Sequence, residues 1–373
     1  MDALTTPSNW QRVRLGDIGK PCMCKRVMKH QTTRYGEIPF YKIGTFGNTA
    51  DAFISKKLFL EYKTKYSFPK KGDILISASG TIGRAVIYDG KPAYFQDSNI
   101  VWIDNDETLV KNDFLFYAYS NIKWNTEHTT ILRLYNDNFK NTLIPLPPLN
   151  EQIAIANVLS DVDHYLYSLD ALILKKESVK KALSFELLSQ RKRLKGFNQA
   201  WQRVRLGDVA NYLTSNLSAE QITQQGKIKV YDVNNFIGYT NTTFISDKPY
   251  ISIVKDGSVG RVRILPPKTN ILSTMGALIA NHKTTTEFLF YLLSNFDFKN
   301  FTSGSIIPHI YFKDYKEKTI SLPPLNEQIA IANILSALDS EIISLKNKKR
   351  QFENIKKALN HDLMSAKIRV LKN

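Results

Sequence analysis

Apolar residues recur at alternating spacings of three and four in two long segments of the chain. The first segment includes Ile155, Leu159, Val162, Leu166 and Leu169, followed by Ile173, Val179 and Leu183. The second includes Ile331, Leu335, Leu338, Ile342 and Leu345, followed by Phe352, Ile355 and Leu359. This spacing, held over about four heptads, predicts two long helices that pack along an apolar line, as in a coiled coil. Some 40 residues at about 1.5 Å each give a length of roughly 60 Å.

Each predicted helix follows the same sequence, LPPLNEQ, at residues 146–152 and 322–328. The two prolines are excluded from a helix interior, and the asparagine is a favoured N-cap residue. The glutamate then falls in the first turn, where the helix dipole favours a negative charge. We therefore expect Asn150 and Asn326 to be the N-caps of the two helices.

The charges of the two helices predict how they pair. Residues 150–174 contain four acidic and no basic residues, whereas residues 175–195 contain eight basic and two acidic ones. The second helix has the same order, with three acidic and no basic residues in 326–345, then nine basic and two acidic in 346–372. A parallel pair would place like charges side by side, so an antiparallel pair is favoured. Pairing with a helix of another chain, and basic ends that are merely solvated, remain open alternatives.

The remaining sequence predicts two α+β globular domains. Short β-branched and aromatic runs between glycine and proline read as strands. They lie at 13–15, 38–43, 73–77 and 85–88, and then at 204–206, 229–233 and 250–254. Short helices are expected at Asp113–Ser120 and Glu287–Ser294. We expect mixed or antiparallel sheets.

The chain is internally duplicated. WQRVRLGD occupies residues 10–17 and 201–208, LPPLNEQIAIAN occupies 146–157 and 322–333, and KKAL occupies 180–183 and 356–359. Segments 18–145 and 209–321 between the matched ends share only faint similarities, such as SGTIGR at 79–84 with DGSVGR at 256–261, and YNDNF at 135–139 with YFKDY at 311–315. Two units in the same order predict a pseudo-twofold repeat that carries two different globular domains.

Composition narrows the class of protein. A chain of 373 residues that is 43% apolar is long enough for at least two cores. A formal net charge of +17 favours a polyanionic partner, although a merely soluble basic protein is the alternative. Cys22 and Cys24 form neither a CxxC motif nor a zinc quartet and fit a reduced cytosol. We expect no membrane-spanning stretch, and Met1–Thr5 does not resemble a signal peptide.

The glycine turns at 79–84 and 256–261 are candidate DNA contacts. A turn of this kind can bring backbone amides, a hydroxyl and an arginine close to a phosphate or a base edge, although it can equally be a plain strand connection. Basic residues interleaved with aromatics suit the surface of a DNA groove. The candidate DNA-binding residues are Lys25, Arg26, Lys29, Arg34, Lys42, Ser79, Thr81 and Arg84 in the first copy, and Lys229, Lys255, Ser258, Arg261 and Arg263 in the second.

Motifs for catalysis are missing from the sequence. The three double prolines, at 147–148, 266–267 and 323–324, do not fit the (N/D)PP(Y/F) tetrad of DNA methyltransferases. We find no nuclease carboxylate–lysine cluster and no HExxH, GxSxG or Walker sequence. The six histidines (30, 128, 164, 282, 309 and 361) show no ligand spacing. The sequence therefore favours a binding protein without catalytic, cofactor or metal residues of its own.

The order of variable domain, LPPLNEQ helix, second variable domain and second LPPLNEQ helix resembles the specificity subunits of type I restriction-modification systems. The resemblance spans the chain and is most specific at Trp10–Asp17, at the GTIGR turn (80–84), at Ile144–Gln152 and at their second copies. The second turn departs from the first, because Asp256 stands where the first copy has Ser79. That difference puts a shared role of Ser79 in doubt.

The resemblance implies four parts: target recognition domains at 1–145 and 196–321, and helices at 146–195 and 322–373 that set a spacer and dock other subunits. Each domain would read half of a bipartite, asymmetric DNA target. Partners would be double-stranded DNA, two modification (methyltransferase) subunits and restriction (translocase-nuclease) subunits, in the cytoplasm. S-adenosylmethionine, ATP and magnesium would belong to those partners. The alternatives are a basic coiled-coil interaction scaffold and an enzyme with an unrecognised site, such as a nicking nuclease.

Overall fold

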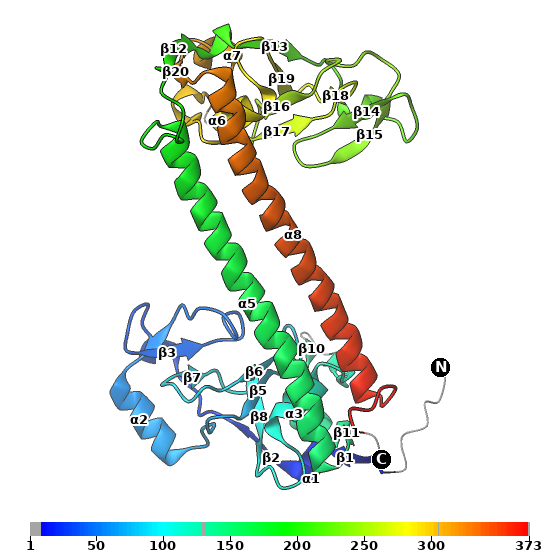
Figure 1. Cartoon of the computed structure of the whole chain (residues 1–373). Helices are drawn as coiled ribbons and strands as arrows, with labels where there is room; N and C mark the ends of the chain where they lie inside the picture. The colour runs from blue at the N-terminus through cyan, green and yellow to red at the C-terminus, as the bar shows by residue number, and fades with distance from the viewer. Residues whose placement is uncertain (1–8, 129–131, 305, 372–373) are drawn as a thin grey trace. The chain divides into compact units, whose positions relative to one another are not determined.

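The computed structural model describes residues 9–128, 132–304 and 306–371, so the expectation about Met1–Thr5 lies outside the described residues. The chain forms two compact units, one made of residues 1–169 and 348–373 and the other of residues 170–347. Each unit contains one globular domain, the first part of the helix that follows that domain and the last part of the other helix. Residues 1–169 and 348–373 are called unit 1, which contains domain 1, and residues 170–347 are called unit 2, which contains domain 2 (Figure 1).

Domain 1 is built on a four-stranded antiparallel sheet of order β2-β8-β5-β6, from Gly19–Met23, Ile100–Asn105, Ile74–Ser77 and Ala85–Ile87. A mixed three-stranded sheet, β4-β3-β7, is formed by Phe53–Ile54, Ile38–Tyr41 and Tyr94–Phe95, with β3 and β7 parallel. The first and last strands, β1 (Gln11–Arg14) and β11 (Leu143–Leu146), pair with each other. The mixed α+β architecture predicted from the strand pattern is confirmed.

Domain 2 has the same topology although its sequence has diverged. Its four-stranded sheet is β13-β19-β16-β17, from Ala210–Thr214, Met275–Ala280, Tyr250–Val254 and Val262–Leu265. Its mixed sheet is β15-β14-β18, from Phe236–Thr240, Ile228–Tyr231 and Asn270–Ile271, and β12 (Gln202–Arg205) pairs with β20 (Thr319–Leu322). Domain 1 also has α2 (Lys56–Lys65) between β4 and β5, where domain 2 passes directly from β15 to β16.

Short helices complete the domains. Domain 1 has α1 (Leu15–Ile18), η1 (Lys29–Gln31), α3 (Asn112–Tyr119), the small strands β9 (Glu127–His128) and β10 (Leu132–Arg133), and α4 (Asn136–Asn141). Domain 2 has η2 (Leu206–Asp208), η3 (Ala219–Gln221), α6 (Thr286–Ser294), η4 (Lys299–Phe301) and α7 (Phe312–Tyr315). Leu15 and Leu206 therefore begin helical turns, which corrects the expectation that they end the first strand of each domain. These two leucines are fully buried.

The two long helices are α5 (Leu149–Leu188) and α8 (Leu325–Met364), and they run antiparallel within each unit. In unit 1, Asp163 of α5 pairs with Lys356 of α8, and the ring of Tyr165 packs at a tilt against that of Phe352. In unit 2, Lys176 and Lys180 of α5 pair with Glu341 and Asp339 of α8. In both units, residues later in α5 contact residues earlier in α8. This order confirms the antiparallel pairing predicted from charge.

The apolar line predicted for the helices is confirmed at most of its positions and is wrong at Val179 and Ile355. Ile155 and Leu159, and their counterparts Ile331 and Leu335, are 0–1% exposed and join the cores of their domains. Leu169 and Ile342 are also buried, whereas Val162, Leu166, Leu338 and Leu345 are partly exposed. Val179 is 45% exposed and Ile355 is 51% exposed, and the next residues, Lys180 and Lys356, form ion pairs with the opposite helix instead.

The duplicated sequences WQRVRLGD and LNEQ meet in the structure. Trp10 Nε1 donates to Glu151 Oε2 at 3.0 Å, and Arg369 Nη2 donates to the same oxygen at 2.9 Å. In unit 2, Trp201 Nε1 donates to Glu327 Oε2 at 3.0 Å, and Arg193 Nη2 donates to the same oxygen at 2.7 Å. Both glutamates are nearly inaccessible, and a buried carboxylate must be paired in this way. These Trp–Glu–Arg triads attach each domain to the helix that follows it and to the segment just after the end of the other helix.

The helices begin two residues earlier than expected. The carbonyl of Pro148 accepts the amide of Gln152 at 2.9 Å, so Leu149 is already helical and Asn150 lies in the first turn. Pro324 takes the same place before Leu325. The N-cap assignment to Asn150 and Asn326 is therefore wrong, because a proline carbonyl accepts the first helical bond without needing the missing N–H.

One helix, α8, is long and apolar enough by length and composition to cross a membrane, which corrects the expectation that no stretch approaches that length. This helix carries the buried Glu327 and the ion-paired Asp339, and both contact domain 2 or α5. Its apolar residues Ile331 and Leu335 are buried in the core of domain 2. These contacts are those of a helix packed within a folded unit.

Candidate nucleic-acid interface

The two glycine turns, at 79–84 and 256–261, have the same backbone conformation. The amide of Gly83 donates to the carbonyl of Ser77 and that of Gly260 to the carbonyl of Val254, both at 2.9 Å. Gly83 has φ +84°, and an added Cβ would lie 2.0 Å from Nε1 of Trp124. Gly260 has φ +80°, and its Cβ would lie 2.6 Å from the ring of Phe298. The second glycine of each turn is therefore required by packing as well as by φ.

The first glycine of each turn faces open space. An added Cβ at Gly80 would approach nothing closer than 3.7 Å, and Gly257 has no neighbour within 4 Å. The adjacent Thr81 and Ser258 are exposed. The outer edge of each turn is thus free to approach another molecule, whereas its inner edge is packed.

The arginine that ends each turn is held by a neighbouring loop. Arg84 Nη1 donates to the carbonyl of Phe46 at 2.9 Å, and Arg261 Nη2 donates to Asn234 Oδ1 at 2.9 Å. Both arginines remain exposed. Each arginine therefore braces the turn against the loop that follows β3 or β14, and its guanidinium still has free donors for a phosphate.

A loop that the sequence did not single out, Gln96–Asn99, organises the candidate residues of domain 1. Gln96 Oε1 accepts the amide of Ile43, next to Lys42. Asp97 forms an ion pair with Arg26 at 2.8 Å. Asn99 Oδ1 accepts both the Ser79 hydroxyl, at 2.8 Å, and Arg133, at 3.0 Å. No local motif marks this loop, because its function depends on partners distant in the sequence.

The other candidates of domain 1 are placed as follows. Ser79 is 7% exposed and already hydrogen-bonded, so a direct DNA contact would require that bond to be replaced. Lys42 forms an ion pair with Asp51 at 2.8 Å. Lys25 is exposed, with Nζ 5.1 Å from the centre of the Tyr66 ring. Exposed Lys29 and Arg34 lie in and after η1, and the structure does not join them to the Gln96–Asn99 loop.

Domain 2 brings two of its five candidate residues, Arg261 and Arg263, together on one loop. Arg263 Nη1 donates to the carbonyl of Asn234, and its guanidinium lies 5.3 Å from the centre of the Tyr231 ring. Arg261 contacts the same asparagine, so two arginines converge on one loop. Exposed Lys229 lies two residues before Tyr231 on β14 and shares its face. Ser258 is at the open edge of the turn, and Lys255 is half-buried at the end of β16.

A loop closed by Ser303 and His309, of which residues 303–304 and 306–309 are described, is the clearest feature that sequence reasoning missed. The amide and carbonyl of Ser303 pair with those of His309, at 2.9 and 2.7 Å. A hydrogen bond of 2.7 Å joins His309 Nδ1 and Asp256 Oδ1, and the amide of Gly257 donates to the carbonyl of Pro308. The loop is thereby fixed to the glycine turn, and it displays Ile306, which is 92% exposed, and Ile307, which is 56% exposed.

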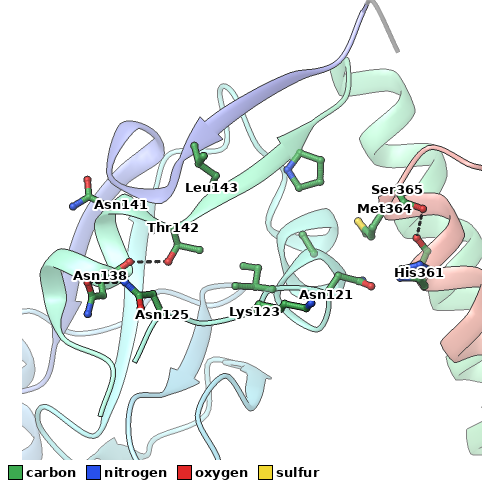
Figure 2. A pocket seen from close by; sticks show the side chains of 13 residues that line it. Asn121, Lys123, Asn125, Asn138, Asn141, Thr142, Leu143, His361, Met364 and Ser365 are labelled. Atoms are coloured by element: carbon green, nitrogen blue, oxygen red, sulfur yellow. Dashed lines mark hydrogen bonds between the residues drawn. The ribbon is translucent and has the colours of Figure 1, made fainter. Parts of the chain in front are cut away.

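The described residues offer no arrangement for catalysis. A hollow of about 450 Å³ between domain 1 and the end of α8 is lined by amide, hydroxyl and apolar side chains with one lysine and one histidine, and none of its lining residues is acidic (Figure 2). Among the described residues, no group of three His, Cys, Asp or Glu side chains is placed to hold a metal ion. Burial raises the pKa of Cys24 to about 12 and also raises that of Cys22, so neither thiol is an activated nucleophile.

Comparison with known proteins identifies the family. The family model of the type I restriction modification DNA specificity domain matches residues 7–176 and again residues 198–354. The chain belongs to this family. The two matches coincide with the two copies found by internal duplication, and the subunit is, like its relatives, a non-catalytic specificity component.

Individual relatives agree with this assignment. A protein described as a type I restriction enzyme specificity subunit of Haemophilus influenzae is 64% identical over 148 residues, which cover 39% of this chain and 38% of that protein. The MjaX specificity subunit of Methanocaldococcus jannaschii is 30% identical over 404 aligned positions, covering 98% of this chain and 95% of that protein. The crystal structure of an S subunit from M. genitalium shares the fold, with a TM-score of 0.64, 20% identity and 98% of each chain covered.

Proposed function

We propose that this specificity subunit binds double-stranded DNA and that each globular domain reads one half of a split target. Residues 1–145 and 196–321 are the recognition domains, and residues 146–195 and 322–373 are the helices that set the gap between half-sites. The main support for the proposal is that the two domains share one fold but have different exposed surfaces. Base contacts differ with side chains, so one fold with two surfaces suits two unlike half-sites.

Equivalent positions in the two domains show this difference. Beside the glycine turn, domain 1 places Ser79, Asn99 and Arg133 in one hydrogen-bonded group. Domain 2 places Asp256 and His309 there. A donor-rich group and a carboxylate–imidazole pair present different patterns to base edges. The target should therefore be asymmetric.

The charge of the subunit supports DNA as the partner. With 51 lysines and arginines against 34 acidic residues, the subunit attracts a polyanion at long range. Neutralised phosphates release counterions, so affinity should fall steeply with salt. The candidate side chains that remain exposed include Thr81 and Arg84 in domain 1 and Ser258 and Arg261 in domain 2.

The long helices support docking of two copies of one partner. Four pairs of exposed apolar residues are related by the 176-residue offset of the repeat. They are Leu149 with Leu325, Ile153 with Ile329, Tyr167 with Ile343, and Val179 with Ile355. Exposed apolar residues repeated in this way indicate protein-binding surfaces, and their duplication fits two identical modification subunits. Restriction subunits join that complex, which acts in the cytoplasm.

Selection from a pool of random duplexes tests the proposal. The full chain, assembled with the modification subunits of its own system, should enrich a split motif with two unlike halves and a constant spacer. Binding of that motif should weaken with a steep dependence on salt. Enrichment of no motif would instead indicate an interaction scaffold. Cleavage or nicking by the purified chain with magnesium alone would indicate an enzyme.

A further inference from the structure

Each domain contacts both long helices through a second triad, formed by a tyrosine, an aspartate and a lysine. In unit 1, Tyr117 of α3 donates its hydroxyl to Asp163 Oδ2 of α5 at 2.8 Å. Lys356 of α8 donates to the other oxygen of Asp163 at 2.5 Å, and its Nζ lies 5.5 Å from the centre of the Tyr117 ring. One carboxylate therefore joins three elements: the domain, its own helix and the opposite helix.

Unit 2 repeats this arrangement atom for atom. Tyr291 of α6 donates to Asp339 Oδ2 of α8 at 2.8 Å. Lys180 of α5 donates to Asp339 Oδ1 at 2.5 Å and lies 5.8 Å from the centre of the Tyr291 ring. Tyr117 and Tyr291 are 7% and 5% exposed. Burial, followed by the bond to the aspartate, raises the pKa of both hydroxyls, so each keeps its proton and donates it.

A neighbouring contact between the two helices is different in the two units, so the chemistry is not repeated at every position. Next to the triad of unit 2, Lys176 forms an ion pair with Glu341 at 2.7 Å. The equivalent residues in unit 1 are Phe352 and Tyr165, whose ring centres are 4.6 Å apart. At this position helix pairing is thus maintained by different chemistry in the two units. The Tyr–Asp–Lys chemistry is the same in both units where a domain is contacted.

The Tyr–Asp–Lys triads are the second attachment of each domain. Glu151 and Asp163, the carboxylates of the two triads in unit 1, are twelve residues apart on α5, or about 18 Å along the helix. A domain held at one point can rotate about it, whereas two points this far apart fix its angle to the helices. A hydrogen bond of Ser120 with Asn360 in unit 1, and of Ser184 with Asn295 in unit 2, adds a contact between the domain and the opposite helix.

We propose that the two Tyr–Asp–Lys triads fix the angle of each recognition domain on the helix pair and thereby determine which spacer length the subunit accepts. This inference rests on the proposed function, because a spacer exists only if the two domains read separated half-sites. Tyr117, Asp163, Lys356, Tyr291, Asp339 and Lys180 are positioning residues: they act through the domain and touch no base. Without a triad the domain would tilt, and duplexes with neighbouring spacers would be bound almost as well.

Two lysines on consecutive turns of α5 give a matched test. Lys180 belongs to a triad and Lys176 does not, yet each pairs with an acidic residue of α8 and each side chain is 30% exposed. The full chain, assembled with its modification subunits, is titrated with duplexes that carry the selected half-sites at the preferred spacer and at one base pair more or less. The measured quantity is the ratio of Kd values between these spacers, with thermal unfolding recorded for each variant.

Lys180→Met should reduce the ratio about three- to tenfold, as expected for the loss of one hydrogen bond of ordinary strength, and leave both half-motifs unchanged. Tyr291→Phe, which keeps the ring and removes the hydroxyl, should do the same, whereas Lys176→Met should change the ratio less than about twofold. Equal effects of Lys180→Met and Lys176→Met, or no effect of Lys180→Met and Tyr291→Phe, would overturn the inference. A wild-type complex that enriches no split motif would overturn the proposed function, and with it the inference.

Discussion

Ile306 exposes an apolar side chain almost completely in the loop that Ser303 and His309 close. Gly304, with φ +89°, allows the loop to close, since a Cβ there would lie 2.4 Å from the carbonyl oxygen of Ile307. Hydrogen bonds to Ser303 and Asp256 fix the other side of the loop through His309. An exposed apolar side chain of this kind can contact the methyl group of a thymine in the major groove.

We predict that Ile306→Ser weakens binding of the target more than tenfold, because about 1.5–3 kcal/mol of apolar burial is lost. The half-motif read by domain 1 and the thermal stability should be unchanged. Leu174→Ser is the control, since Leu174 is 64% exposed on α5, away from the loop, and is not one of the repeated apolar pairs. The measurement is the Kd of each variant for the target duplex, obtained by direct titration. Equal weakening by both substitutions would remove Ile306 from the DNA-binding surface.

At the residue scale, sequence reasoning found residue types but not their partners. It selected Arg84 and Arg261 as phosphate contacts, and the structure shows that each also holds a backbone or amide oxygen of a nearby loop. It did not select Asn99, whose two bonds connect residues 20 and 34 positions away. Such roles follow from tertiary contacts that no local pattern encodes. The candidate DNA contacts therefore stay predictions.

At the element scale, the attachment of the second domain depends on Glu327 at the start of α8. Its carboxylate is 1% exposed and accepts from Trp201 and Arg193. We predict that Glu327→Ala lowers the free energy of unfolding by about 3 kcal/mol, because a buried guanidinium contact and an indole donor lose their partner. Glu341→Ala, which removes a half-exposed ion pair from the same helix, should cost less than about 1 kcal/mol. Denaturant unfolding of both variants makes the comparison, and similar losses would contradict the anchoring role.

The apolar pattern predicted both long helices, and it was accurate where a domain core covers them. Ile155 and Leu159 are buried as the heptads require. The pattern was wrong at Val179 and Ile355, because Lys180 and Lys356 reach their aspartates from the neighbouring position. Hydrophobicity alone cannot find an interface made by ion pairs. The opposing charge distribution, by contrast, predicted the antiparallel direction correctly.

Shortening both helices by one heptad tests them as the spacer. Removing 169–175 together with 345–351, which are equivalent in the repeat, shortens each helix by about 10 Å with little rotation. We predict a preferred spacer shorter by about three base pairs, at 3.4 Å per pair, with both half-motifs retained. Replacing the same heptads with others that keep their apolar positions should leave the spacer unchanged. Altered half-motifs, or an unaltered spacer in the shortened protein, would show that the helices do not set it.

At the scale of the whole molecule, the repeat was the most informative feature of the sequence. Trp10–Asp17 and its copy predicted two equivalent units, and the structure extends that equivalence to domains whose sequences no longer match. The shared topology could not be predicted, because the strands are short and half of them pair with strands distant in the sequence. Buried positions such as Phe139 and Tyr315, which are both 1% exposed, keep their size and place while surface residues have changed.

The central claim is that each domain reads one half of the target independently of the other. Exchanging residues 18–145 for the corresponding segment of another specificity subunit, and repeating the duplex selection with the modification subunits present, tests it most directly. The account predicts that one half-motif changes, while the other half-motif and the spacer stay as in the wild type. A change in both half-motifs, or in neither, would contradict it.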